Sequence, residues 1–152
     1  MAEGRAISPK DEVSDPSFRT EVHVRFEDCD PAGIVFYPRF LVMFNNLVEQ
    51  WWQQGLEFSF HELVIQNRWG IPTVHLEVDF YRPSTLGDVL SANLYVHSLG
   101  RSSVKARIVL AGQDGEVRVK GNVVLVLMDL NEGRAIPFPD WLRERIQAFV
   151  KD

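Results

Sequence analysis

The chain has 152 residues, of which 45% are hydrophobic and 24% are charged, a composition ordinary for one globular domain with a full core. Its net charge of −5 argues against nucleic acid as the main partner. A single cysteine, Cys29, excludes an internal disulfide and fits a reducing compartment, and no apolar run is long enough to span a bilayer. We therefore expect a soluble cytoplasmic protein with neither a nucleic-acid nor a membrane partner.

The first 26 residues divide into a polar tail and a strand. Residues 1–17 contain two prolines and show no hydrophobic periodicity. They predict a disordered N-terminal tail, followed by a single domain over residues 18–152. From Thr20 to Phe26 apolar and polar residues alternate, which predicts a half-buried strand that leads directly into the next segment.

Residues 28–40 read DCDPAGIVFYPRF and place two carboxylates between this strand and a long helix. Proline fixes φ and Gly33 permits a positive φ, so the bend can fold Asp28 and Asp30 back toward the helix start. Pro38 suits the first helical turn, where its missing N–H costs nothing. A carboxylate beside the unpaired N–H groups of a helix start is suited to attacking or hydrating a polarised carbonyl.

Two helices follow the bend. The first is predicted from Pro38 to about Gln54, because apolar residues recur there with helical spacing and a glycine follows. Ser59 and Glu62 have the spacing of a capping box, which predicts a second, short helix over residues 60–68.

Four alternating segments then predict four strands, over residues 74–81, 90–96, 104–110 and 117–127. Because short connections join consecutive strands, we expect an antiparallel meander. After Asn122 the last strand is apolar on both faces, which indicates packing or an oligomer interface. A final amphipathic helix is predicted over residues 140–150. The fold class is therefore α+β, with one antiparallel sheet wrapped around one long helix.

The motif over residues 28–40 resembles that of the hotdog-fold acyl-CoA thioesterases, most of all the 4-hydroxybenzoyl-CoA thioesterase branch. The resemblance extends from about Phe18 to Val150, with weaker support from residues 70–72, 100–102 and 134–137. It implies a hotdog fold and the hydrolysis of a 4-hydroxybenzoyl-CoA-like aromatic thioester to the free acid and CoA. It also implies a homodimer with shared pockets, assembled further to a homotetramer, and no metal or organic cofactor.

The resemblance also assigns roles to individual residues. Asp30 falls on the catalytic carboxylate, and the backbone N–H of Tyr37 would bind the thioester carbonyl. Substrate contacts are expected from the bend, the long helix and two distant segments: Gly33, Ile34, Asn45, Arg101, Ser102 and Arg134. The last three would lie near the CoA phosphates. Asn45 stands where the hydroxybenzoyl branch carries an aspartate, which bears on the preference for a para-hydroxyl group.

Several alternatives stay open at this stage. Asp30 can act as a nucleophile or as a general base, and a purely structural turn aspartate is the competing interpretation. Asp28 is expected in a turn or a salt bridge, and Arg118 is one of several basic residues that could form a phosphate site. The rival functions are a short-chain aliphatic acyl-CoA thioesterase and a non-catalytic hotdog dimer that binds acyl-CoA.

Overall fold

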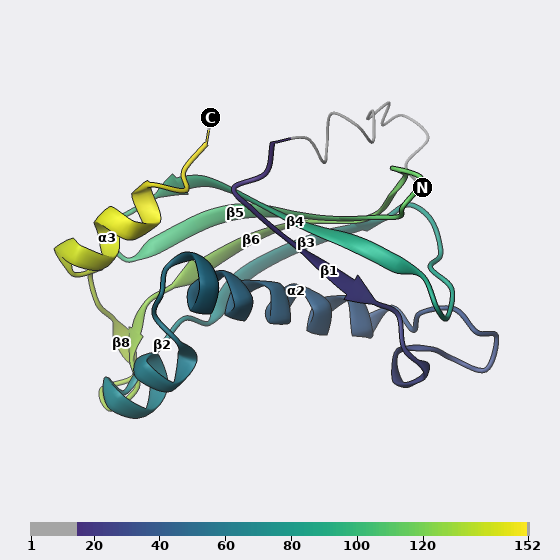
Figure 1. Ribbon diagram of the computed structural model, residues 1–152. Helices are drawn as coiled ribbons and strands as arrows, with labels where there is room; N and C mark the ends of the chain where they lie inside the picture. Colours follow the sequence, from purple (N-terminus) through teal and green to yellow (C-terminus); the bar gives the residue numbers. More distant parts are fainter. Residues whose placement is uncertain (1–14, 152) are drawn as a thin grey trace.

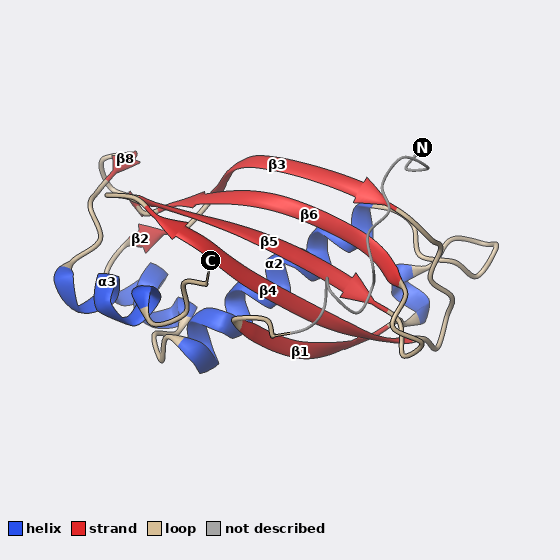
Figure 2. Ribbon diagram, turned by 90° about the horizontal axis from the view of Figure 1, so that it is seen from above, coloured by secondary structure: helices blue, strands red, loops and turns tan. Residues whose placement is uncertain are grey.

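Five strands form one antiparallel sheet that curls over a long helix (Figure 1). The computed structural model describes residues 15–151. The strand order across the sheet is β1-β4-β5-β6-β3, so β1 and β3 are the two edges (Figure 2). The strands are β1 (Phe18–His23), β3 (Thr73–Phe80), β4 (Val89–Leu99), β5 (Ser103–Ala111) and β6 (Val117–Val126).

Helix α2 (Pro38–Gln50) lies along the concave face of this sheet (Figures 1 and 2). Its apolar stripe is buried against inward-facing strand residues and forms the core. The helix continues as a π-helical turn, η2 (Trp51–Gly55), which buries both of its tryptophans. The predicted α+β class, with an antiparallel sheet wrapped around one helix, is confirmed.

A glycine in the middle of the sheet allows α2 to approach closely. A Cβ atom at position 121 would lie 2.4 Å from Cε2 of Phe44 and 3.3 Å from the carbonyl oxygen of Glu77. No side chain larger than hydrogen fits there unless the Phe44 ring moves. Gly121 on β6 therefore fixes how deeply the centre of α2 sits in the sheet.

The strand pairing differs from the predicted meander at one point. β4, β5 and β6 pair in sequence, but β3 pairs with β6 and not with β4. The eight residues 81–88 between β3 and β4 can span about 26 Å, whereas the two strands are only three strand spacings, or about 14 Å, apart. This segment therefore crosses the end of the sheet and does not form a hairpin.

The late strand β6 lies inside the sheet, and the interface expected from its two apolar faces stays a prediction. β6 has hydrogen-bonded neighbours on both sides, because β3 and β5 flank it. The exposed edge is β3 instead, in which Val74 is 58% exposed and Leu76 is 39% exposed.

The remaining elements lie at the far end of α2. The predicted capping box is present, since the N–H of Glu62 donates to Oγ of Ser59 and the N–H of Ser59 donates to Oε1 of Glu62, both at 3.2 Å. It precedes the short helix η3 (His61–Gln66). A small sheet that was not predicted and the last helix complete the chain: β2 (Trp69–Gly70), β7 (Met128–Asp129), β8 (Arg134–Ala135) and α3 (Asp140–Gln147).

Two sequence predictions concern the ends of the chain and the membrane. Residues 1–14 of the predicted tail lie outside the described residues, whereas the N–H of Ser17 already donates to the carbonyl oxygen of Leu94 on β4 at 2.8 Å. No helix within residues 15–151 combines the length and apolar character that a membrane span needs.

Replacing Gly121 with alanine should destabilise the protein, because the added methyl group overlaps the Phe44 ring. Overpacking of this kind costs about 1–3 kcal/mol, measurable as a lower midpoint of urea unfolding. The matched control is Asn122→Ala on the same strand, whose exposed side chain should change stability by less than about 0.5 kcal/mol. Equal effects of the two substitutions would show that the close approach at Gly121 does not limit packing.

Candidate functional site

The carboxylate motif forms a tight hairpin between β1 and α2. A short helical turn, η1 (Phe26–Asp28), precedes it, and Cys29 pairs with Val35 across the hairpin. The N–H of Asp30 donates to the carbonyl oxygen of Ile34 at 2.9 Å, and Gly33 adopts a φ of 81° at the tip. The sequence produces this shape because only glycine adopts such a φ without strain.

One oxygen of the Asp30 carboxylate is held and the other is open. Oδ1 accepts a hydrogen bond from the N–H of Ala32 at 2.9 Å, which fixes the direction of the side chain. Within residues 15–151 no further hydrogen bond or ion pair to this half-buried carboxylate is present. A held carboxylate with an available oxygen is the arrangement that a nucleophile or general base needs.

The start of α2 directly follows the hairpin. The N–H of Phe36 donates to the carbonyl oxygen of Asp28, and the N–H of Arg39 donates to that of Phe36. Among the described residues no group accepts a hydrogen bond from the N–H of Tyr37, and Pro38 has none to donate. The Tyr37 N–H is therefore an unused donor at the positive end of the helix.

Aromatic rings and apolar side chains surround this helix start. The Tyr37 ring is 61% exposed and contacts the rings of Phe36 and Phe80, with centroid distances of 5.7 and 6.0 Å. Ile34 is 36% exposed at the hairpin. These groups give the approach to Asp30 an apolar rim, which excludes water from a bound substrate.

The crossing segment 81–88 is hydrogen-bonded to the backbone of the hairpin. The N–H of Val35 donates to the carbonyl oxygen of Ser84, and that of Leu86 donates to Gly33, both at 2.9 Å. Asp88 ends this segment, and the N–H of Thr85, followed by the Arg118 guanidinium, lowers the pKa of its carboxyl. Arg118, expected among the phosphate-binding candidates, instead pairs with Asp88 at 3.0 Å and is a structural residue.

The two aspartates of the motif have different surroundings. Asp28 is 6% exposed, and its Oδ2 accepts the N–H of Arg25 at 2.9 Å. Its Oδ1 accepts a hydrogen bond from Nε of Arg39 at 3.1 Å and lies 3.1 Å from Nη2 of the same guanidinium group. Asp28 is thus in both a turn and a salt bridge, as expected. Arg39 was missed, although a cation in the first turn of a helix that follows two carboxylates is a readable signal.

Cys29, between the two aspartates, is an unreactive thiol. Its S–H donates to the carbonyl oxygen of Arg25 at 3.4 Å. Loss of solvation, together with the charges of Asp28 and Asp30, raises the pKa of the thiol. The nucleophilic thiolate is therefore disfavoured.

Asn45 lies two turns along α2 from the hairpin, in a cavity of about 130 Å³ between α2 and β3. We call this the β3-side cavity; its lining is apolar except for Asn45 and Thr73: Leu41, Phe44, Asn45, Val48, Thr73, Leu76, Ile108 and Val123. Among the described residues neither Asn45 nor Thr73 has a side-chain hydrogen bond. The cavity thus offers apolar walls and two unused polar groups.

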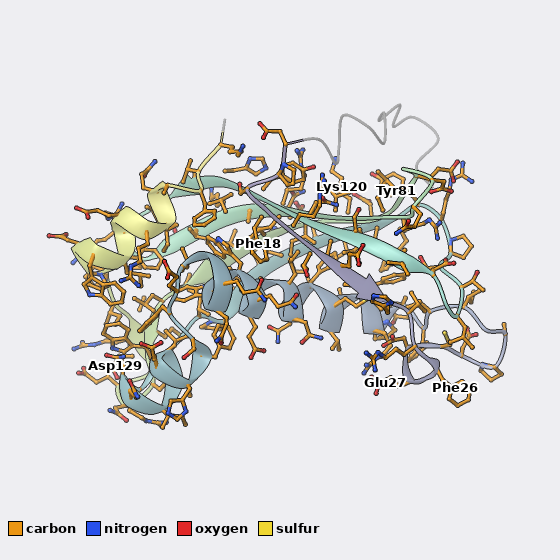
Figure 3. The ribbon with its side chains drawn as sticks, viewed as in Figure 1. Phe18, Phe26, Glu27, Tyr81, Lys120 and Asp129 are labelled. Carbon is orange, nitrogen blue, oxygen red and sulfur yellow. The ribbon has the colours of Figure 1, made fainter. Side chains whose placement is uncertain are left out.

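The other predicted site residues lie at the opposite end of the molecule. Arg101 and Ser102 connect β4 to β5, and the eleven residues of β4 separate them by about 35 Å from the segment that supports the hairpin. Arg134 is exposed on β8 and pairs with Glu132 at 2.6 Å. Asp129, the β7 partner of Arg134, and Phe26 beside the hairpin mark the two ends in Figure 3. One chain does not bring these residues to Asp30.

Metal ligation has no candidate in the part of the chain that the structure describes. No three His, Cys, Asp or Glu side chains within residues 15–151 lie close enough to hold an ion.

An antiparallel sheet wrapped around a central helix, with the carboxylate hairpin at the helix start, defines a hotdog fold. A family model described as the thioesterase-like superfamily matches residues 24–146. The chain belongs to the thioesterase-like superfamily. The expected hotdog fold and the expected class of thioester hydrolase are confirmed at the level of this family.

Three curated relatives have thioester substrates in their names. The 1,4-dihydroxy-2-naphthoyl-CoA hydrolase of Synechococcus elongatus is 30% identical, over 82% of this chain and 90% of that protein. Its namesake from Synechocystis is 31% identical, over 53% of this chain and only 57% of that relative. The long-chain acyl-CoA thioesterase FadM of Escherichia coli is 26% identical, over 88% of this chain and 99% of FadM.

A solved structure gives a similar result. A thioesterase from Thermus thermophilus, in complex with coenzyme A and Zn, is 33% identical. The two structures superpose with a TM-score of 0.74, over 90% of this chain and 96% of the other. None of the relatives described here carries the name of the 4-hydroxybenzoyl branch, so that assignment stays a prediction.

Proposed function

We propose that this protein is an acyl-CoA thioesterase that hydrolyses an aromatic thioester to the free acid and CoA. The observation that carries the proposal is the Asp30 carboxylate, which has one open oxygen and is bonded into the hairpin that leads to the unused N–H of Tyr37. Family membership supports the reaction class, and the coenzyme A bound to the similar Thermus thermophilus structure supports the leaving group.

The reaction needs a group that stabilises the negative charge on the thioester oxygen and a carboxylate that attacks or activates water. The thioester oxygen becomes negative as the carbonyl is attacked, and the Tyr37 N–H at the helix start would stabilise that charge by a few kcal/mol. Asp30 either attacks the carbonyl carbon itself or takes the proton from the attacking water. In the first route the carbon–sulfur bond breaks as Asp30 forms a mixed anhydride with the acyl group, and a water then hydrolyses this anhydride to the free acid and the Asp30 carboxylate. In the second route the water adds to the carbonyl directly and the carbon–sulfur bond breaks as the acid forms. In both routes CoA leaves as the thiolate and takes up a proton, and neither requires a metal or an organic cofactor.

The β3-side cavity supports an aromatic acyl group. Asn45 is eight residues from Tyr37, which places it about 12 Å along the helix from the reacting carbonyl. The cavity volume of about 130 Å³ is near that of the roughly 150 Å³ cavity that accepts benzene, so a single ring matches it in size. Asn45 and Thr73 can hydrogen-bond a ring hydroxyl, so a hydroxylated one- or two-ring acyl group, such as 4-hydroxybenzoyl or a naphthoyl group, fits best.

We further propose a homodimer formed through the β3 edge, with the active sites shared between subunits. Antiparallel pairing of two β3 strands places the Thr73 end of one strand beside the Phe80 end of its partner. The partner's segments around Arg101, Ser102 and Arg134 then approach the Asp30 end of the first chain. These residues would bind the CoA phosphates. The homotetramer and the cytoplasmic location expected from the sequence belong to the same proposal.

The function is tested with a thiol-release assay across hydroxylated aromatic, short-chain aliphatic and long-chain acyl-CoA esters. We expect the highest kcat/KM for hydroxybenzoyl- or hydroxynaphthoyl-CoA, because these groups fill the cavity and hydrogen-bond at its polar end. A preference for long-chain esters, like the one in the name of FadM, would contradict the aromatic assignment. Binding without turnover of any ester would identify a non-catalytic acyl-CoA-binding protein.

Asp30→Asn should lower kcat by a few orders of magnitude with little change in substrate binding, because the amide keeps the shape but loses charge and basicity. Binding of CoA, followed by calorimetry, and the thermal midpoint serve as controls for folding. A variant that retains activity within about tenfold of the parent would show that Asp30 is not the reacting group.

Arg101→Ala should raise KM with little change in kcat, and only for full CoA esters, because a phosphate contact contributes equally in ground and transition states. The control substrate is a thioester that carries only the pantetheine arm, which should be unaffected.

A mixing experiment tests whether the active sites are shared between subunits. Arg101→Ala and Asp30→Asn are unfolded, mixed and refolded together, so that mixed dimers form. If Arg101 serves the partner's site, the mixed dimer contains one intact site and shows the parental KM. If the mixture keeps the raised KM of Arg101→Ala, or sedimentation finds an active monomer of 17.4 kDa, sites are not shared.

A further inference from the structure

The ion pair between Asp28 and Arg39 joins three parts of the candidate site. Asp28 belongs to η1, and its backbone oxygen accepts the N–H of Phe36 at 2.9 Å. Its carboxylate accepts a hydrogen bond from Nε of Arg39, in the first turn of α2, and forms an ion pair with that guanidinium group. The same side chain also closes η1 through the N–H of Arg25. Asp28 therefore contacts the segments on both sides of the Asp30 hairpin.

We propose that Asp28 and Arg39 are positioning residues: their ion pair holds the Asp30 hairpin against the helix start, and Arg39 offsets the Asp28 charge two residues from Asp30. The inference rests on the proposed hydrolysis by Asp30. The two aspartates of the motif then have different roles. Asp28, which is paired with Arg39, holds the local structure, and Asp30, which has an open oxygen, reacts.

Burial explains why the pair needs both members. The Asp28 side chain is 8% exposed, and an isolated charge so deeply buried is strongly unfavourable. Arg39 supplies two N–H donors from one planar group, which a lysine ammonium cannot reproduce.

Other charged groups face the pair, and of these only Arg25 is changed, in the control variant below. Glu27 lies 3.9 Å from Arg39. Around the same cavity lie Glu21 and His23 of β1, Arg25 before η1 and Glu49 of α2. Glu27 and Phe26 project from η1 at this end of the molecule (Figure 3).

The pair can be reached from solvent. Asp28 and Arg39 line a second cavity of about 430 Å³ on the other flank of α2, which we call the β1-side cavity. The Arg39 side chain is 34% exposed there. A shortened side chain at position 39 therefore leaves a space that a small cation can enter, which makes chemical rescue feasible.

The experiment compares Arg39→Ala, Arg39→Lys and the control Arg25→Ala with the parent enzyme. Arg25 carries the same charge and lines the same cavity, but it holds Asp28 through its backbone N–H, which the substitution keeps. Each protein is assayed for kcat, KM and the pH dependence of kcat/KM, with and without guanidinium chloride at concentrations below unfolding. Sodium chloride at equal ionic strength is the salt control.

We expect Arg39→Ala to lower kcat about 10–100-fold with KM nearly unchanged, as a misplaced catalytic group does. Guanidinium, and not sodium, should restore kcat, and Arg39→Lys should fall between the parent and Arg39→Ala.

Hydrogen exchange supplies a readout that does not depend on activity. The amide of Phe36 should exchange faster in Arg39→Ala than in Arg25→Ala, because its acceptor is the backbone oxygen of Asp28.

Two results would overturn the inference, provided that the parent hydrolyses its ester. One is an Arg39→Ala enzyme with parental kcat. The other is a loss of activity equal to that of Arg25→Ala and insensitive to guanidinium, with unchanged exchange at Phe36. If the parent hydrolyses no ester, the proposed function fails, whereas faster exchange at Phe36 would still support the positioning role.

Discussion

The close packing of α2 against the sheet is the constraint on which the candidate site depends. Because Phe44 lies against Gly121, a shift of α2 along the sheet would force the ring into a strand. The start of the helix is therefore fixed relative to the crossing segment 81–88. The hairpin is bonded to that segment through Val35 and Ser84 and to the helix start through Phe36 and Asp28. The position of Asp30 thus follows from the core.

Much of the fold can be predicted from the sequence, because hydrophobic alternation and helical spacing are local signals. The five strands, the long helix and the bonds between Ser59 and Glu62 all follow from such patterns. The partner of β3 could not be predicted, because alternation shows which face of a strand is buried but not which strand lies beside it. Residues 81–88 count as a short connection in the sequence, which favours a hairpin, although their length also allows a crossing.

The part of the candidate site that is formed by residues adjacent in sequence could be predicted. The part that depends on which distant residues the tertiary structure brings together could not. The hairpin with Asp30, the open donor at Tyr37 and the structural role of Asp28 all lie within ten residues. Arg39 was overlooked because a charged residue in a helix is usually part of a solvated face, and only its distance to Asp28 reveals the pairing. Arg101 and Arg134 lie at the far end because the length of β4 separates them from the hairpin.

The two edges of the sheet differ in a way that limits how copies of the chain can associate. Along β1 the exposed positions carry charge, including Glu21 and His23, which lie 3.9 Å apart. Charged edge strands resist the addition of another strand. The β3 edge carries a similar pair, His75 and Glu77, 3.8 Å apart, but it also exposes the apolar side chains of Val74 and Leu76. A sheet with one receptive edge can be extended only once, and two-fold pairing then uses up that edge in both copies. Strand pairing of this kind ends in a closed particle and cannot propagate into a fibre.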